Sequence, residues 1–264
     1  MSELLKEKRI VVIGGTSGIG LAAVNSFHQQ GAKVVAVGLE NDVLPDDPIH
    51  VIIRDIREEE AAFDAIQQCV VAFGGFDALY HIAGGSGRKW GDGPLHTISL
   101  KGWRKTFQLN LESVMLSNRA AIQYFLAHDQ SGSILNLSSV LAFHPAPAHF
   151  ATHAYAAAKA GIIGFSKSIA SYYANANIRV NVLAPGLTYT PMARRAAGDP
   201  AISEYIKTKQ PLDGGRMATP DDLTAAACYL LSDGSRFTTG QVLEIDGGWS
   251  ISDGQVPDVN PVKT

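Results

Sequence analysis

Residues 9–13 (RIVVI) lead directly into residues 14–20 (GGTSGIG), where a helical pattern begins. The apolar, β-branched run predicts a buried strand, and the glycines allow a sharp turn into the helix. Without Cβ atoms in the way, a pyrophosphate can approach this backbone, and the free N–H groups at the helix start would attract its charge. The spacing differs from Gly-x-Gly-x-x-Gly, and the Gly-Lys-Ser/Thr of a P-loop does not follow. The stretch therefore predicts a dinucleotide site, with a glycine-rich turn that binds nothing as the alternative.

The same alternation of apolar run and helical pattern continues along the whole chain. Several runs show little polar alternation, which is typical of strands covered on both faces. Repeats of this kind predict right-handed βαβ units, and hence an α/β fold with one doubly wound parallel sheet and helices on both faces. The predicted strands are residues 9–13, 33–37, 50–54, 77–82, 132–137, 179–184 and 241–245, and the predicted helices are residues 18–30, 58–73, 100–128, 154–176 and 220–231.

The composition of the 264 residues, 46% apolar and 18% charged, is that of a globular protein. Because no linker rich in Pro, Gly or Ser divides the chain, we predict a single domain over residues 1–264, with a loose tail at 253–264. Lys and Arg total 22 against 25 Asp and Glu, a balance that argues against a nucleic-acid partner. No apolar run reaches the ~18–20 residues that cross a bilayer, so no membrane association is expected.

The cysteine content and the character of residues 1–9 indicate the cellular compartment in which the protein is expected. Cys69 and Cys228 are too few for a disulfide framework, and both lie in apolar helical patterns where we expect ordinary core packing. Residues 1–9 carry mixed charge without a long apolar core, unlike a secretory signal. The expected location is therefore cytoplasmic.

Tyr155 and Lys159 lie four residues apart in a helical pattern, which places them on one helix face. A free tyrosine has a pKa of about 10, and a neighbouring ammonium lowers it toward the neutral range. A pair at this spacing is common and by itself indicates nothing. Ser139 adds weight, because it follows the predicted strand 132–137 and ligands bind at the C-terminal ends of parallel strands. Its hydroxyl can donate a hydrogen bond to a carbonyl oxygen that gains negative charge.

Together these residues resemble the short-chain dehydrogenase/reductase family, and its ketoacyl-carrier-protein reductase branch in particular. The resemblance covers residues 8–248 and implies a Rossmann-like fold of about seven strands. Each motif is weak alone, and their common order makes them jointly specific. The motifs are the loop glycines Gly14, Gly18 and Gly20, Ser139 ahead of Tyr155-x-x-x-Lys159, Pro185-Gly186 followed by Thr190, Thr239-Gly240-Gln241 and Asp246-Gly247-Gly248.

The resemblance implies four catalytic residues. Tyr155 would pass a proton to or from the substrate oxygen, and Ser139 would hold that oxygen. Lys159 would bind the nicotinamide ribose and lower the pKa of Tyr155. Asn110 would prop a helix and hold a water for proton relay. Ser138 is the other candidate for the serine role, although the family pattern favours Ser139.

The resemblance also implies a nicotinamide dinucleotide as cofactor and assigns residues to it. The backbone near Thr188 and the side chain of Thr190 would meet the carboxamide, and Asp55 resembles the acid that contacts adenine in the family. The full predicted set is Gly14, Ser17, Gly18, Ile19, Gly20, Leu39, Asp55, Ile56, Ala83, Gly84, Tyr155, Lys159, Pro185, Gly186, Thr188 and Thr190.

Three features depart from the family pattern. Ile13 stands where the family usually has Thr, and residues 81–84 read His-Ile-Ala-Gly in place of Asn-Asn-Ala-Gly. We expect the lost asparagine to affect local bracing more than chemistry. The step from Ser139 to Tyr155 is longer than usual, and its extra residues fall in 141–153, which should border the substrate pocket. Because no ordered ligand spacing or carboxylate accompanies the histidines of this loop, no metal site is predicted.

The choice between NAD and NADP depends on the end of the second strand. NADP needs a cation for its 2′-phosphate, and the family's NADP enzymes place Arg where this chain has Leu39. The position of the usual NAD-marking Asp is Gly38, and Glu40 is a displaced ribose acid. The absence of cations favours NAD without excluding NADP, and Arg54 is the residue most able to reverse this preference.

Residues 188–216 are expected to form a mobile lid over the substrate. Its candidate pocket residues are Tyr189, Met192, Arg194 and Arg195; the two arginines could bind an anionic substrate, although a solvated helix face is the favoured interpretation. Family analogy further implies a homotetramer, with one interface on the helices at 100–128 and around Tyr155, and another near the last strand.

The leading hypothesis is thus an NAD-dependent oxidoreductase that interconverts a secondary alcohol and a ketone of unidentified structure. One alternative is an NADPH-dependent ketoacyl or ketone reductase. The other is a non-catalytic dinucleotide-binding regulator of the same fold, against which the complete set of Tyr155, Lys159, Ser139 and Asn110 argues.

Overall fold

The computed structural model describes residues 3–40 and 49–255, and its centre is a seven-stranded, fully parallel sheet. The strand order is β3-β2-β1-β4-β5-β6-β7, so the chain runs outward from β1 to one edge and then returns to build the other half. This confirms the predicted doubly wound α/β fold. The strands are β1 (Arg9–Ile13), β2 (Lys33–Gly38), β3 (Ile49–Ile53), β4 (Ala78–His81), β5 (Gly132–Leu137), β6 (Ile178–Pro185) and β7 (Val242–Ile245).

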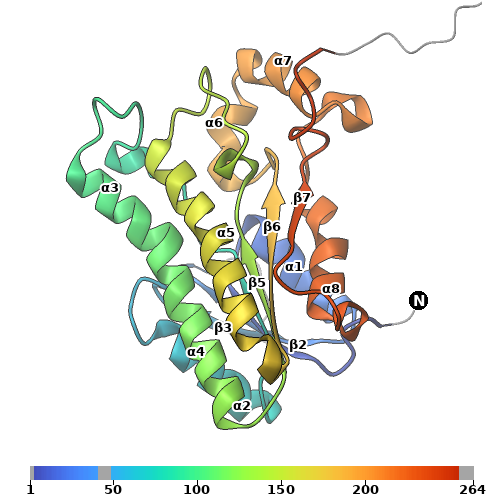
Figure 1. Ribbon diagram of the computed structural model, residues 1–264. Helices are drawn as coiled ribbons and strands as arrows, with labels where there is room; N and C mark the ends of the chain where they lie inside the picture. Colours follow the sequence, from blue (N-terminus) through green and yellow to red (C-terminus); the bar gives the residue numbers. More distant parts are fainter. Residues whose placement is uncertain (1–2, 41–48, 256–264) are drawn as a thin grey trace, which may run out of the picture.

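Helices cover both faces of the sheet (Figure 1). One face carries α1 (Gly18–Gln29) and α8 (Thr224–Leu231), and the other carries α2 (Ala61–Phe73), α4 (Ser113–Ala127) and α5 (His153–Tyr173). Alternate residues of a strand serve the two faces, since Ile10 and Val12 pack in one apolar core while Val11 and Ile13 pack in the other. This double burial explains why the strand sequences lack polar alternation.

The two cysteines lie in different cores, Cys228 with α1 and Cys69 with α2, on opposite faces of the sheet. Both are buried and unpaired, as predicted from their apolar surroundings. Burial raises the pKa of the Cys69 thiol to about 12, so this group stays protonated and unreactive at neutral pH.

The single helix predicted over residues 100–128 is wrong in one respect. Helix α3 (Leu100–Phe107) passes through a π-helical turn, η2 (Gln108–Glu112), before α4 begins. A π-helical turn leaves carbonyl groups poorly satisfied, and the hydroxyl of Ser113 donates to the carbonyl oxygen of Leu109 at 2.6 Å. The turn sits where the helix passes the sheet and contains Asn110, which is fully buried.

A third apolar cluster supports the predicted lid segment. Helices α6 and α7 of this segment lie beyond the C-terminal ends of the strands (Figure 1). The predicted lid segment, residues 188–216, contains η5 (Pro191–Ala193), α6 (Arg194–Ala197), α7 (Pro200–Lys209) and η6 (Leu212–Gly215). Ile202 and Ile206 of α7 pack in this cluster with Trp249, which is 1% exposed. Most of the predicted tail, residues 256–264, lies outside the described residues. Within the described residues, no helix has the length and apolar character needed to cross a membrane.

Candidate active site

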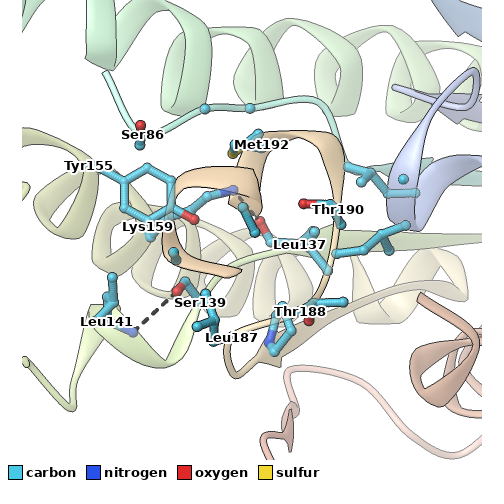
Figure 2. A pocket seen from close by; sticks show the side chains of 18 of the residues that line it. Ser86, Leu137, Ser139, Leu141, Tyr155, Lys159, Leu187, Thr188, Thr190 and Met192 are labelled. Atoms are coloured by element: carbon cyan, nitrogen blue, oxygen red, sulfur yellow. Dashed lines mark hydrogen bonds between the residues drawn. The ribbon is translucent and has the colours of Figure 1, made fainter. Parts of the chain in front are cut away.

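A cavity of about 350 Å³ opens at the C-terminal ends of the central strands, beneath the lid (Figure 2). Its walls come from the glycine loop, the loop after β4, the end of β5, helix α5 and the lid. The predicted site residues that line it are Gly14, Ser17, Gly18, Ile19, Ala83, Gly84, Ser139, Tyr155, Lys159, Pro185, Gly186, Thr188 and Thr190. Segments far apart in the sequence therefore meet at one hollow.

The glycine loop packs too tightly for side chains. A Cβ on Gly14, whose φ is +86°, would lie 2.7 Å from the backbone nitrogen of Ala83. A Cβ on Gly20 would lie 1.8 Å from the carbonyl oxygen of Gly14, so Gly20 serves packing and does not line the cavity. The Ser17 side chain makes no capping bond to α1, which leaves the first N–H groups of the helix facing the cavity side. These features fit a bound pyrophosphate.

The two serines after β5 have separate tasks. The Ser138 hydroxyl donates to the carbonyl oxygen of Lys159 at 2.8 Å, which ties β5 to α5. The Ser139 oxygen accepts the backbone N–H of Leu141 at 3.2 Å (Figure 2), and its hydroxyl lies next to Tyr155 at the cavity. The geometry therefore favours Ser139 as the residue that meets a substrate.

Lys159 lines the cavity, and its Nζ donates to the carbonyl oxygen of Leu137 at 2.7 Å. Its Nζ lies 5.7 Å from the ring centroid of Tyr155, and a Cβ on Gly84 would come within 3.3 Å of it. Burial lowers the pKa of Lys159 to about 7. The amine is thus charged in only part of the molecules near neutral pH.

The pKa of Tyr155 departs from the expectation. Burial raises it above the ordinary value, and the nearby Ser139 hydroxyl lowers it by less. Lys159 is not among the causes, because its amine is desolvated and turned to the Leu137 carbonyl. The lowering of the Tyr155 pKa by Lys159 that the resemblance implied is therefore not seen.

Asn110 stands behind the cavity and does not line it. Its Nδ2 donates to the carbonyl oxygens of Gly85 and Thr106 at 2.9 and 2.8 Å, and its Oδ1 accepts the Gly85 N–H at 2.9 Å. The π-helical turn thus braces the loop after β4. His81 adds to this bracing: its Nδ1 lies 2.7 Å from the Ser117 hydroxyl, and burial lowers its pKa to about 3.

Asp92 is a buried carboxylate whose role was not predicted from the sequence. It is 3% exposed, and it accepts the N–H of Ala154 at 3.0 Å and the N–H of Tyr155 at 2.9 Å. The first residue of α5 is His153 and its N-cap, Thr152, makes no side-chain capping bond, so Asp92 supplies the cap from a distant loop. No local sequence signal marks this contact.

Three predicted cofactor residues do not line the cavity: Leu39 is exposed, Ile56 packs against α2, and Asp55, the predicted adenine contact, accepts hydrogen bonds from Arg57. Their contacts with adenosine stay predictions. Arg54, the cation most able to favour NADP, is paired with Glu58 and Asp64.

The substrate side of the cavity agrees with part of the prediction. The extended loop at 141–153 borders it as expected, and so do Met192 and Arg195 of the lid, whereas Tyr189 and Arg194 do not. The sequence analysis missed several residues of this wall, including Ser86, Arg88, Leu187, Ala196 and Trp249. They lie in loops and short helices whose positions depend on the assembled sheet.

Comparison with known proteins finds relatives that are all described as dehydrogenases or reductases. The sequence model of a family described as enoyl-(acyl carrier protein) reductase matches residues 14–250. Over 96% of the chain and 98% of the relative, it is 34% identical to 3beta-hydroxysteroid dehydrogenase 1 of Eggerthella lenta. It is 32% identical to cis-4-hydroxycyclohexanecarboxylate dehydrogenase of Sinomonas cyclohexanicum, over 95% and 99% of the two chains.

A third relative is the 3-oxoacyl-(acyl-carrier-protein) reductase of Chlamydia trachomatis, 33% identical over 94% of this chain and 99% of that protein. Among solved structures, the ligand-free aldohexose dehydrogenase of Thermoplasma acidophilum superposes with a TM-score of 0.83. It is 28% identical, and the match covers 99% of this chain and all of that one.

Proposed function

The chain belongs to the short-chain dehydrogenase/reductase family, and we propose that it is an oxidoreductase that interconverts a secondary alcohol and a ketone with a nicotinamide cofactor. The observation that carries this is the meeting of Ser139, Tyr155 and Lys159 at the cavity that the glycine loop also lines. When bound, the nicotinamide supplies the hydride donor or acceptor.

The roles of the residues follow from their contacts. Ser139 donates a hydrogen bond to the substrate oxygen, since its own oxygen is already held by the Leu141 N–H. Tyr155 transfers the proton to or from that oxygen. Lys159 binds the cofactor ribose, and it lowers the pKa of Tyr155 once a partner holds it in the charged form. Asn110 fixes the loop at Gly85 that closes the cavity.

We propose NAD as the preferred cofactor. Leu39 offers no charge to a 2′-phosphate, and Arg54 is held by two carboxylates. Gly38 sits against Thr16, whose Oγ1 would lie 1.9 Å from a Cβ there, so an acid cannot occupy that position without moving Thr16. The preference thus rests on missing cations, and NADP is the alternative. Fluorescence titration with NADH and NADPH separates the two.

The substitution Tyr155→Phe tests the proposed chemistry. We expect turnover to fall by about 10²- to 10⁴-fold, because the phenol proton is lost, while NADH still binds. Tyr172→Phe, on the same helix with a largely exposed side chain, is the matched control and should keep full activity. Activity retained in the Tyr155 variant would reject its assigned role.

A panel of alcohols and ketones with both cofactors identifies the substrate class. The named relatives act on a hydroxysteroid, a hydroxycyclohexanecarboxylate and a 3-oxoacyl thioester, so the panel should contain cyclic and open-chain members. NADPH-dependent reduction of oxoacyl thioesters alone would favour the reductase alternative. Cofactor binding without any turnover would favour the non-catalytic regulator.

We further propose a cytoplasmic homotetramer. Free, buried cysteines fit a reducing compartment. The edge strand β7 leaves backbone groups open to a second copy, and apolar side chains near it are exposed, with Leu243 at 38% and Phe237 at full exposure. The outer faces of α4 and α5 would form the other interface, as in the family.

A further inference from the structure

The substrate end of the cavity combines apolar walls with two positive charges. Leu141, Phe150 and Trp249 line it together with the guanidinium-bearing Arg88 and Arg195. Arg88 belongs to the short η1 helix (Arg88–Trp90) after β4, and Arg195 to α6 of the lid. The two cations thus come from different segments of the chain and line the same cavity.

Arg88 is fixed toward the loop at 141–153. Its Nη2 donates to the carbonyl oxygen of His149 at 3.2 Å. Burial lowers the pKa of Arg88, and the neighbouring charge of Arg195 lowers it further, while Asp92 raises it. Asp92 already accepts two backbone N–H groups of α5, so its oxygens are largely occupied. Arg88 and Arg195 thus both line the cavity and the charge of Arg195 is felt at Arg88, while the Asp92 carboxylate is bonded to the start of α5.

Of the arginines in the described residues, some pair with a carboxylate and others, Arg88 and Arg195 among them, do not. Arg9, Arg57 and Arg216 each pair with a carboxylate. Within residues 3–40 and 49–255, neither Arg88 nor Arg195 has an ion-pair partner. Two like charges that face one cavity are unfavourable unless an anion enters between them. A guanidinium pair is well suited to a carboxylate or phosphate, which it can bind through several N–H donors.

We propose that Arg88 and Arg195 bind an oxyanion, a carboxylate or a phosphate, carried by the alcohol or ketone substrate. This inference rests on the proposed function, because it assigns the substrate class of the same cavity. The apolar side chains of Leu141, Phe150 and Trp249 would surround the carbon skeleton between the anion and the reacting oxygen at Tyr155. The substrate is thus a compact hydroxy or oxo acid, or a phosphate ester, in place of a neutral alcohol.

A binding experiment tests this without turnover. The enzyme saturated with NADH is titrated with cyclohexanecarboxylate, cyclohexanecarboxamide and cyclohexyl phosphate, and calorimetry reports each affinity. We expect at least one anion to bind about tenfold more tightly than the neutral amide, in line with hydrogen bonds to charged groups. The anion that binds better distinguishes a carboxylate from a phosphate.

Arg88→Gln and Arg195→Gln should each bring the ratio of anion affinity to amide affinity close to one. Arg195→Lys should retain part of this preference. Arg194→Gln is the matched control: Arg194 is the neighbouring residue on α6 and is exposed like Arg195, but it does not line the cavity, so the preference should stay unchanged. An unaltered melting temperature and NADH affinity in each variant show that the fold and the cofactor site are intact.

Three results would overturn the proposal. The anions could bind no better than the amide, or the preference could survive in both glutamine variants. Loss of NADH affinity in Arg195→Gln would instead place this arginine on the cofactor. If the proposed function itself were wrong, the results would be different: the protein would not bind a nicotinamide cofactor, or Tyr155→Phe would leave turnover unchanged.

Discussion

At the scale of single residues, the buried amine of Lys159 lowers the stability of the folded protein. Its pKa is about 7 in the folded protein, against about 10.5 in an unfolded chain. Below pH 7 the buried amine is charged, and its full desolvation opposes folding. Between these two pKa values the unfolded chain binds a proton that the folded chain does not, so stability from this group rises with pH.

Lys159→Met should therefore stabilise the protein most at pH 7 and below, and its advantage should shrink as pH rises to 10. We expect the difference in unfolding free energy between variant and parent to change by ~2–4 kcal/mol over that range. Thermal melts of the cofactor-free proteins measure it. Lys167→Met, an exposed lysine on the same helix, should show no such trend. A pH-independent difference would refute the lowered pKa.

Leu39 is a second residue where one change should have a clear effect. It is 67% exposed at the end of β2, so a longer side chain fits without disturbing the core. Leu39→Arg should raise NADPH affinity about tenfold, because a guanidinium there can bind the 2′-phosphate, and should leave NADH affinity nearly unchanged. Isothermal titration with both cofactors checks this. No gain for NADPH would mean that the ribose lies elsewhere.

At the scale of elements, helix α5 depends on a carboxylate from outside it. Asp92 holds its first N–H groups, including that of Tyr155 itself. Asp92→Ala should lower stability by ~1–2 kcal/mol and also reduce kcat, since Tyr155 loses its backbone anchor. Asp92→Asn keeps one acceptor oxygen, so it should retain part of the stability and part of the kcat that Asp92→Ala loses.

Ser99→Ala is the control for this prediction. Ser99 caps α3 by accepting the Gly102 N–H at 3.0 Å, so its loss should cost a similar free energy without lowering kcat. Denaturant melts and steady-state kinetics distinguish a positioning effect from a general loss of stability. Equal kcat values for Asp92→Ala and the parent would limit Asp92 to a structural role.

The elements were largely predictable because their signals are local. The apolar runs predicted the bounds of each described strand to within one or two residues, because strands covered by helices on both faces are apolar throughout. The π-helical turn at 108–112 could not be predicted, because a single widened turn leaves the helical sequence pattern almost unchanged. Ser139, Tyr155 and Lys159 carried family motifs, whereas Asp92, Arg88 and Trp249 act through contacts that only the assembled chain creates.

At the scale of the whole molecule, the open edge of the sheet predicts assembly. Phe237 is fully exposed close to β7, so replacing it leaves the monomer's core intact. Phe237→Asp should convert the proposed tetramer to a smaller species, because burying a carboxylate in an apolar interface is costly. Light scattering coupled to size exclusion gives the mass. A parent that is already monomeric would refute the tetramer.

The strand order has a consequence for how the enzyme becomes active as it folds. The cavity wall extends from Gly14 in the first turn to Trp249 after the last strand, and β1 must pair with β4 across two intervening strands in sequence. Contacts of such long range form late and slowly. In a refolding reaction, helical circular dichroism should therefore return well before nicotinamide fluorescence reports a binding site, and neither half of the chain alone should acquire that site.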